Sequence, residues 1–142
     1  MAFTSKKIIL AEDDSSLLDV YRQMFKEADY DIEVASTVSE LSEELRLIRM
    51  GHSQKPDLII LDMMHPNVGG VEILKSIKKS CLTKDIPVFV MSNYHNPDLH
   101  CDLERQNIFP EKYLIKTNHT PAQILGIINN HFLIPTPKTK LA

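Results

Sequence analysis

Five short runs that are mainly apolar alternate with longer amphipathic stretches along the chain. The runs are Ile8–Ala11, Ile32–Ala35, Leu58–Leu61, Ile86–Met91 and Tyr113–Ile115. A run as short and unbroken as Leu58–Leu61 predicts a strand that is buried on both faces. The stretches between the runs repeat apolar residues at helical spacing. Strands and helices in alternation predict an α/β fold, in which a five-stranded parallel sheet has right-handed crossovers and helices on both faces.

Helix-capping residues mark where several of these helices begin and end. Ser15 and Ser16 are predicted to cap the first helix, because a serine hydroxyl accepts a hydrogen bond from a free helical N–H. The segments Thr37–Glu40 and Thr120–Gln123 both have the form of a capping box. Gly51 suits the end of the second helix, where the backbone often turns left-handed.

Polar residues stand directly after four of the five apolar runs. They are Glu12, Asp13 and Asp14 after the first run, Asp62 after the third, Ser92 after the fourth and Lys116 after the fifth. Parallel strands bring their carboxyl ends to one edge of the sheet, where open α/β sheets bind ligands. We therefore expect these carboxylates, the hydroxyl and the ammonium group to converge at that edge.

This set of groups favours phosphoryl chemistry assisted by a metal ion. Carboxylates that are brought together repel one another, which raises their pKa values or requires a cation. Mg²⁺ takes oxygen ligands and is usually held by one or two carboxylates together with a phosphate. Lys116 adds a positive charge for a phosphoryl oxygen, and Ser92 adds a neutral donor. Asp62 in such surroundings would be a good acceptor for a phosphoryl group.

These motifs, in this order, resemble the response regulator receiver domain of two-component and phosphorelay systems. The resemblance covers about residues 6 to 132 and is carried by Glu12-Asp13, Asp62, Pro66, Gly70, Ser92 and Tyr113–Lys116. It implies the (βα)5 flavodoxin-like fold with strand order 2-1-3-4-5. It also implies that Asp62 accepts a phosphoryl group from a sensor histidine kinase or a histidine phosphotransfer protein.

The resemblance implies a role for each residue of the site. Mg²⁺ would be held by Asp13, Asp62 and the backbone carbonyl of Met64, with Glu12 in support. The phosphoryl group would be contacted by Ser92 and Lys116. Ser92 and Tyr113 would form the switch, in which the aromatic ring turns inward when the hydroxyl moves. The protein would assist its own phosphorylation and dephosphorylation without being a turnover enzyme.

Four residues depart from the usual pattern of the family or lie where it varies. Asn93 follows Ser92 where a small alanine is common, and Thr117 follows Lys116 where proline is usual. A cis bond before threonine would cost about 3–4 kcal/mol, so we expect a trans bond and a somewhat different loop. Met64 and Tyr94 lie at positions that tune the lifetime of the phosphoryl group, and their bulk predicts slow loss of phosphate.

Length, charge and cysteine content narrow the class of protein further. The 142 residues are enough for one domain with a substantial core. A formal net charge of −3 gives no general attraction to nucleic acid. No apolar run approaches the length needed to cross a membrane, and the N-terminus lacks the apolar core of a signal peptide. The two cysteines do not have the spacing of a zinc site. We therefore expect a cytoplasmic protein.

Residues 1–132 are expected to form the receiver domain, and residues 133–142 a flexible tail. Only ten residues follow Phe132, too few for an output domain. A stand-alone receiver would therefore signal by changing a protein-binding face. Its expected partners are the phosphoryl donor and an unknown downstream protein, with no direct contact with nucleic acid or membrane. We expect a monomer or a weak homodimer.

Three other classes of protein are compatible with this sheet. A flavin-binding electron carrier would need a phosphate-cradling loop after the first strand, where Glu12, Asp13 and Asp14 would repel a phosphate. An aspartate-nucleophile phosphatase usually has a second aspartate two residues after the nucleophile, and Met64 stands there. A receiver-like interaction module that does not need phosphate is not excluded by sequence motifs.

Overall fold

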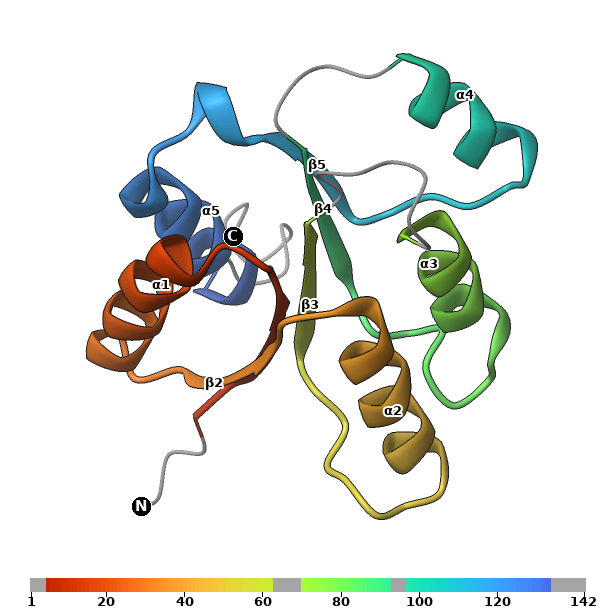
Figure 1. Ribbon diagram of the computed structural model, residues 1–142, viewed down its shortest axis with the longest axis horizontal. Helices are drawn as coiled ribbons and strands as arrows, with labels where there is room; N and C mark the ends of the chain where they lie inside the picture. Colours follow the sequence, from red (N-terminus) through yellow and green to blue (C-terminus); the bar gives the residue numbers. More distant parts are fainter. Residues whose placement is uncertain (1–4, 63–69, 93–96, 134–142) are drawn as a thin grey trace, which may run out of the picture.

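The computed structural model describes residues 5–62, 70–92 and 97–133, and for residues 97, 99 and 100 it describes the main chain alone. Strands and helices alternate throughout these ranges (Figure 1). The strands are β1 (Lys7–Ala11), β2 (Asp31–Ala35), β3 (Leu58–Asp62), β4 (Val88–Ser92) and β5 (Lys112–Ile115). The helices are α1 (Ser15–Glu27), α2 (Val38–Arg49), α3 (Gly70–Lys79), α4 (Pro97–Arg105), the 3-10 helix η1 (Lys116–Asn118) and α5 (Pro121–Leu133).

The five strands form one parallel sheet in the order β2-β1-β3-β4-β5. Helices α1 and α5 lie on one side of this sheet, and α2, α3 and α4 lie on the other (Figure 1). The predicted fold class and strand order are therefore confirmed. None of the helices in the described part of the chain is long and apolar enough to span a lipid bilayer.

Two apolar clusters fill the space between the sheet and its helices. The α1–α5 cluster has as its buried members Ile8, Leu10, Leu18, Tyr21, Phe25, Leu58, Ile60, Phe89, Met91, Leu114, Ile124 and Ile128. The other cluster takes the alternate strand residues, such as Ile9, Ile59 and Leu61, and packs them on α2, α3 and Leu103 of α4. Because both faces are covered, the central strands β1, β3 and β4 are apolar on both faces between their ends, and each buried Leu or Ile contributes about 1.5–3 kcal/mol.

The helix boundaries agree with the sequence at three positions and differ at one. Both capping boxes form, since Thr37 Oγ1 accepts from Glu40 N at 3.1 Å and Thr120 Oγ1 accepts from Gln123 N at 3.1 Å. Gly51, just past α2, has a φ of +80°. The predicted serine cap of α1 is wrong, however. Asp14 is the N-cap, and its Oδ1 accepts from Leu17 N at 3.2 Å, so Ser15 already belongs to the helix.

Two further backbone predictions, the start of β4 and the peptide bond before Thr117, can be compared with the structure. β4 begins at Val88 instead of Ile86, because Ile86 N donates to Thr83 O in a turn before the sheet pairing starts. The peptide bond before Thr117 is trans, as expected, since no described bond is cis. The predictions for Met64, Pro66, Asn93, Tyr94 and the tail at 134–142 fall outside the described residues.

Candidate functional site

The register of the sheet brings the polar residues at the strand ends together. Ala11 of β1 lies beside Leu61 of β3, so the next residues, Glu12 and Asp62, leave the sheet as neighbours. On the other side of β3, Asp62 lies beside Met91, the residue before Ser92. Ser92 in turn lies beside Ile115, and Lys116 follows it. Four of the predicted site residues thus share one edge of the sheet.

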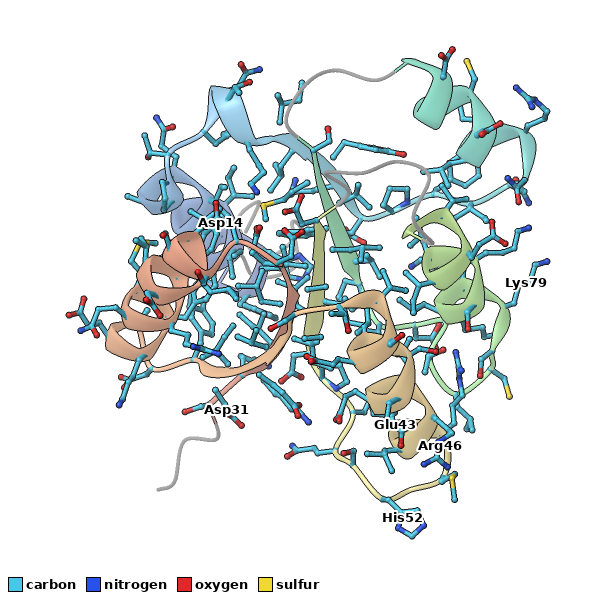
Figure 2. The ribbon with its side chains drawn as sticks, in the orientation of Figure 1. Asp14, Asp31, Glu43, Arg46, His52 and Lys79 are labelled. Atoms are coloured by element: carbon cyan, nitrogen blue, oxygen red, sulfur yellow. The ribbon has the colours of Figure 1, made fainter. Side chains whose placement is uncertain are left out.

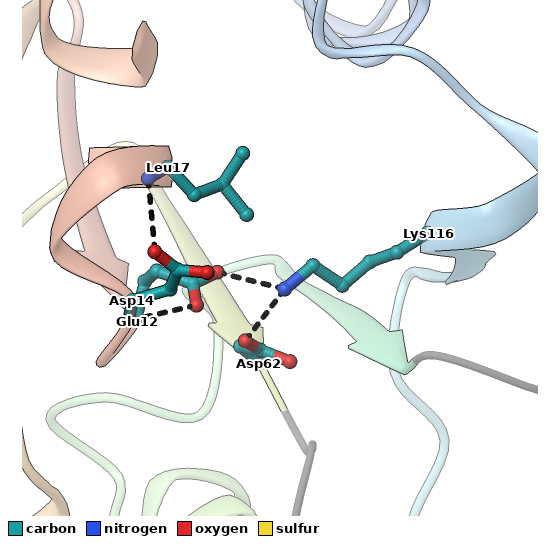
Figure 3. Close-up of polar contacts among 5 residues, drawn as sticks. All are labelled: Glu12, Asp14, Leu17, Asp62 and Lys116. Carbon is teal, nitrogen blue, oxygen red and sulfur yellow. Dashed lines mark hydrogen bonds and ion pairs between the residues drawn. The ribbon is translucent and has the colours of Figure 1, made fainter. Parts of the chain in front are cut away.

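Lys116 joins the two inner carboxylates by direct ion pairs (Figure 3). Its Nζ lies 2.9 Å from Asp62 Oδ2 and 3.1 Å from Glu12 Oε1. The side chains are 11% exposed for Lys116, 3% for Asp62 and none for Glu12. Charges this deeply buried are stable only when each has a partner, so the ammonium group holds both carboxylates in place.

The buried carboxylates change the acid–base properties of the site. Burial raises the pKa of Asp62 to about 7, and the neighbouring Glu12 adds to the rise, while Lys116 opposes it. For Lys116, burial alone would lower the pKa of the ammonium group. The hydrogen bonds and charges of Asp62 and Glu12 outweigh burial, and the pKa of Lys116 is raised. One ammonium group therefore only partly offsets the repulsion between the two carboxylates.

Three carboxylates at this edge have the arrangement of a cation site. Ligand oxygens of Glu12, Asp13 and Asp62 lie within 4.8 Å of one another. Asp62 Oδ1 is buried, and no hydrogen-bond donor in the described ranges reaches it. An anionic oxygen without a donor is costly to bury, and a hard divalent cation would satisfy it. The donor set thus fits Mg²⁺, although Met64, the expected carbonyl ligand, lies outside the described residues.

Asp14 differs from its two acidic neighbours because it lies at the start of α1, as its position before the helix suggested. It caps α1, and its own N–H donates to Glu12 Oε2 at 3.3 Å. Asp14 therefore fixes the start of α1 against the site (Figure 3). The signal for its capping role was present in the chain, since aspartate is a favoured N-cap residue.

The two residues of the predicted switch lie on neighbouring strands. Ser92 is 8% exposed at the end of β4. Tyr113 of β5 is half-buried and packs on the cluster that faces α2, α3 and α4. Burial, followed by the negative charge of Glu104 on α4, raises the pKa of Tyr113 to about 12, so the phenol stays neutral. The roles of Ser92 and Tyr113 stay predictions.

Fold and site together define a single-sheet α/β domain with a cluster of carboxylates at the carboxyl ends of its strands. The family model for the response regulator receiver domain matches residues 8–125. The chain belongs to this family, and is thus a receiver domain of the kind found in two-component response regulators.

Curated relatives include the two-component response regulator ORR6 of Oryza sativa subsp. japonica and the response regulator Rcp1 of Synechocystis sp. The chain is 33% identical to ORR6 over 95 residues, which is 66% of this chain and 54% of that protein. It is 32% identical to Rcp1 over 96 residues, which is 66% of this chain and 65% of Rcp1. The match spans less than two thirds of either relative.

Solved structures agree with this assignment. The phosphorylated cyanobacterial phytochrome response regulator RcpA has a TM-score of 0.74 and 26% identity, over 92% of this chain and 96% of that chain. The Mn²⁺-bound form of Rcp1 has a TM-score of 0.71 and 24% identity over the same shares, a likeness of fold.

Proposed function

We propose that this protein is a phosphoacceptor in which Asp62 takes a phosphoryl group from a phosphohistidine and thereby switches a protein-binding face. The donor is a sensor histidine kinase or a histidine phosphotransfer protein. One observation carries the proposal: Asp62 is a buried carboxylate at a strand end, with Oδ2 on Lys116 and Oδ1 without a donor among the described residues. A structural aspartate at such depth would have both oxygens satisfied.

The chemistry is a transfer of phosphorus from nitrogen to oxygen. An oxygen of the Asp62 carboxylate forms a bond to phosphorus while the P–N bond breaks, and its electron pair stays on the imidazole, which can then take up a proton. The product is an acyl phosphate on Asp62. In this proposal Lys116 pairs with a phosphoryl oxygen, which its Nζ, 2.9 Å from the acceptor carboxylate, supports.

We propose that Mg²⁺ is the cofactor, held by Asp13, Asp62 and the carbonyl of Met64 with Glu12 in support. Bound there, the ion would offset the repulsion between the carboxylates and the incoming phosphoryl oxygens. Asp13 is exposed while Glu12 is buried, so Asp13 is the more accessible of the two to a hydrated ion. The Mn²⁺-bound form of Rcp1 supports a divalent ion in a relative.

The proposed protein has no turnover of its own, and each molecule carries one phosphoryl group at a time. The signal leaves through contact with a downstream protein that prefers the phosphorylated form. Such a partner shifts the population only by as much as its affinities for the two forms differ.

Phosphorylation of a single residue tests the proposal. Acetyl phosphate with Mg²⁺ should add one phosphoryl group to the wild-type chain, detected by intact mass, and Asp62→Asn should abolish it. Asp19→Asn is the matched control, because Asp19 is an exposed aspartate of α1, and labelling should persist. Equal labelling of Asp62→Asn and wild type would show that Asp62 is not the acceptor. Absence of labelling in the wild type, also with purified kinases, would favour an interaction module that does not need phosphate.

A further inference from the structure

Tyr21 brings a hydroxyl group into an otherwise apolar part of the core. It is 2% exposed and belongs to the α1–α5 cluster, whose other buried members are aliphatic residues, phenylalanines and a methionine. Its ring stacks on Phe25 with centroids 5.7 Å apart. Phenylalanine would fill the same space without the cost of burying a hydroxyl, so the hydroxyl requires a polar partner.

The fold places this hydroxyl under the acidic site. Side chains two apart in a strand share a face, and Leu10, Ile60 and Leu114 of the same cluster each stand two residues before a charged residue of the site. Those charged residues are Glu12, Asp62 and Lys116. Long side chains in a helix point towards its N-terminus, and the N-terminus of α1 is fixed at the site by Asp14. We therefore expect the phenol of Tyr21 to point towards the carboxyl ends of the strands, where the carboxylates lie.

Electrostatics agree with this placement. Burial raises the pKa of Tyr21 to about 12, and the negative charges of Glu12 and Asp62 add to the rise. The charges of both carboxylates act on the phenol, which agrees with a hydroxyl that lies towards them. Polar groups that lie near one another without a direct hydrogen bond are commonly joined by a water molecule.

We propose that Tyr21 is a positioning residue for the cation and phosphoryl site, with its hydroxyl joined through a water molecule to the carboxylates of Glu12 and Asp62. The inference rests on the proposed function of that site. In this role the neutral phenol supports the carboxylates from the protein side, opposite the exposed Asp13. It keeps them in the arrangement in which Lys116 and a cation meet their oxygens.

Mg²⁺ binding to Tyr21→Phe tests the proposal. This change keeps the ring and its stacking on Phe25 and removes only the hydroxyl. The Kd for Mg²⁺, measured by calorimetry, should rise roughly three- to tenfold, the range that one hydrogen bond produces. Phosphorylation by acetyl phosphate should fall at limiting Mg²⁺ and recover at saturating Mg²⁺. The urea midpoint of unfolding should be unchanged or higher.

Tyr30→Phe is the matched control. Its hydroxyl donates to Asn129 Oδ1 at 2.5 Å, away from the site, so its loss should lower stability and leave the Kd for Mg²⁺ unchanged. In the wild-type protein, Mg²⁺ should also shift the ring resonances of Tyr21 and not those of Tyr30. This second readout holds even if the Tyr21 variant folds poorly.

Two results would overturn the inference, and they are distinguishable. If the wild type binds Mg²⁺ and Tyr21→Phe binds it within twofold, with no shift of the Tyr21 ring, then Tyr21 only fills the core. If the wild type neither binds Mg²⁺ nor takes up a phosphoryl group, then the proposed function fails, and this inference fails with it.

Discussion

Three consecutive acidic residues after β1 have three different environments. Glu12 is buried, with one oxygen on Lys116 and the other accepting from Asp14 N. Asp13 is exposed and lies in the carboxylate cluster. Asp14 caps α1. Identical charge in neighbouring positions thus serves a buried ion pair, a candidate cation ligand and a helix cap, which single substitutions can separate.

Asp13→Asn should change Mg²⁺ binding, whereas Asp14→Ala should change stability. Asp14→Ala removes the cap and should lower the free energy of unfolding by about 1 kcal/mol, while the Kd for Mg²⁺ changes little. Asp13→Asn should weaken Mg²⁺ binding markedly and leave stability nearly unchanged, because the residue is exposed and a charged ligand is lost. Urea unfolding and calorimetry measure the two quantities. A loss of Mg²⁺ affinity as large in Asp14→Ala as in Asp13→Asn would contradict the division of roles.

At the scale of elements, α2 and α3 are tied by one arginine. Arg49 Nη2 donates to Ser76 O at 3.1 Å and to Ser76 Oγ at 2.9 Å in a partly buried position. On the same helix, Arg46 pairs with Glu43 at the surface, with both side chains 55% exposed (Figure 2). The two arginines are three residues apart. Arg49 bonds to the neighbouring helix α3, whereas Arg46 pairs with a residue of its own helix.

Arg49→Ala should therefore destabilise the fold more than Arg46→Ala. Loss of charged donors to a neighbouring helix should lower the free energy of unfolding by about 1–2 kcal/mol. The exposed pair of Arg46 is screened by solvent, so its loss should fall within the error of a urea titration. Equal effects of the two changes would mean that the contact between α2 and α3 does not depend on Arg49.

The sequence predicted elements well where a strong pattern decided them. Apolar runs predicted the central strands β1, β3 and β4 because both faces of the sheet are covered there, and the two capping boxes predicted the starts of α2 and α5. It failed where several residues compete for one role. Asp14, Ser15 and Ser16 are all good caps, and only the path of the chain from β1 selects Asp14. The observed β4 begins later than predicted for a similar reason. Ile86 is apolar, but its N–H bonds within a turn and not in the sheet.

For the molecule as a whole, the topology explains why the site was predictable in outline. Strand ends in a parallel sheet share an edge, so the convergence of Glu12, Asp62 and Lys116 followed from the order of elements. The individual hydrogen bonds and ion pairs within the site could not be predicted from the order of elements. The ion pairs of Lys116 with both carboxylates depend on packing between distant segments, and so does the lack of a donor to Asp62 Oδ1 among the described residues.

The same topology connects the site to α4. Helix α4 follows β4. Among its side chains that the structure describes, Leu103 is buried at 1% exposed, while Cys101, Asp102, Glu104 and Arg105 are exposed. An element with few buried contacts is among the easiest to shift. Ser92 at the end of β4 and Tyr113 on β5 lie between the site and this helix.

Beryllofluoride with Mg²⁺, which imitates the phosphoryl group, should therefore change amide chemical shifts well beyond the pocket. Negative charge at Asp62 would draw the Ser92 hydroxyl towards it, and Tyr113 would fill the space that Ser92 leaves. We expect shifts at residues 12–14 and 62, and a second set across 97–116. Ser92→Ala should keep the first set and reduce the second, because the pocket still binds while the hydroxyl that couples it to Tyr113 is gone. Shifts confined to the pocket in the wild type would mean that the site binds phosphate without moving α4 and β5.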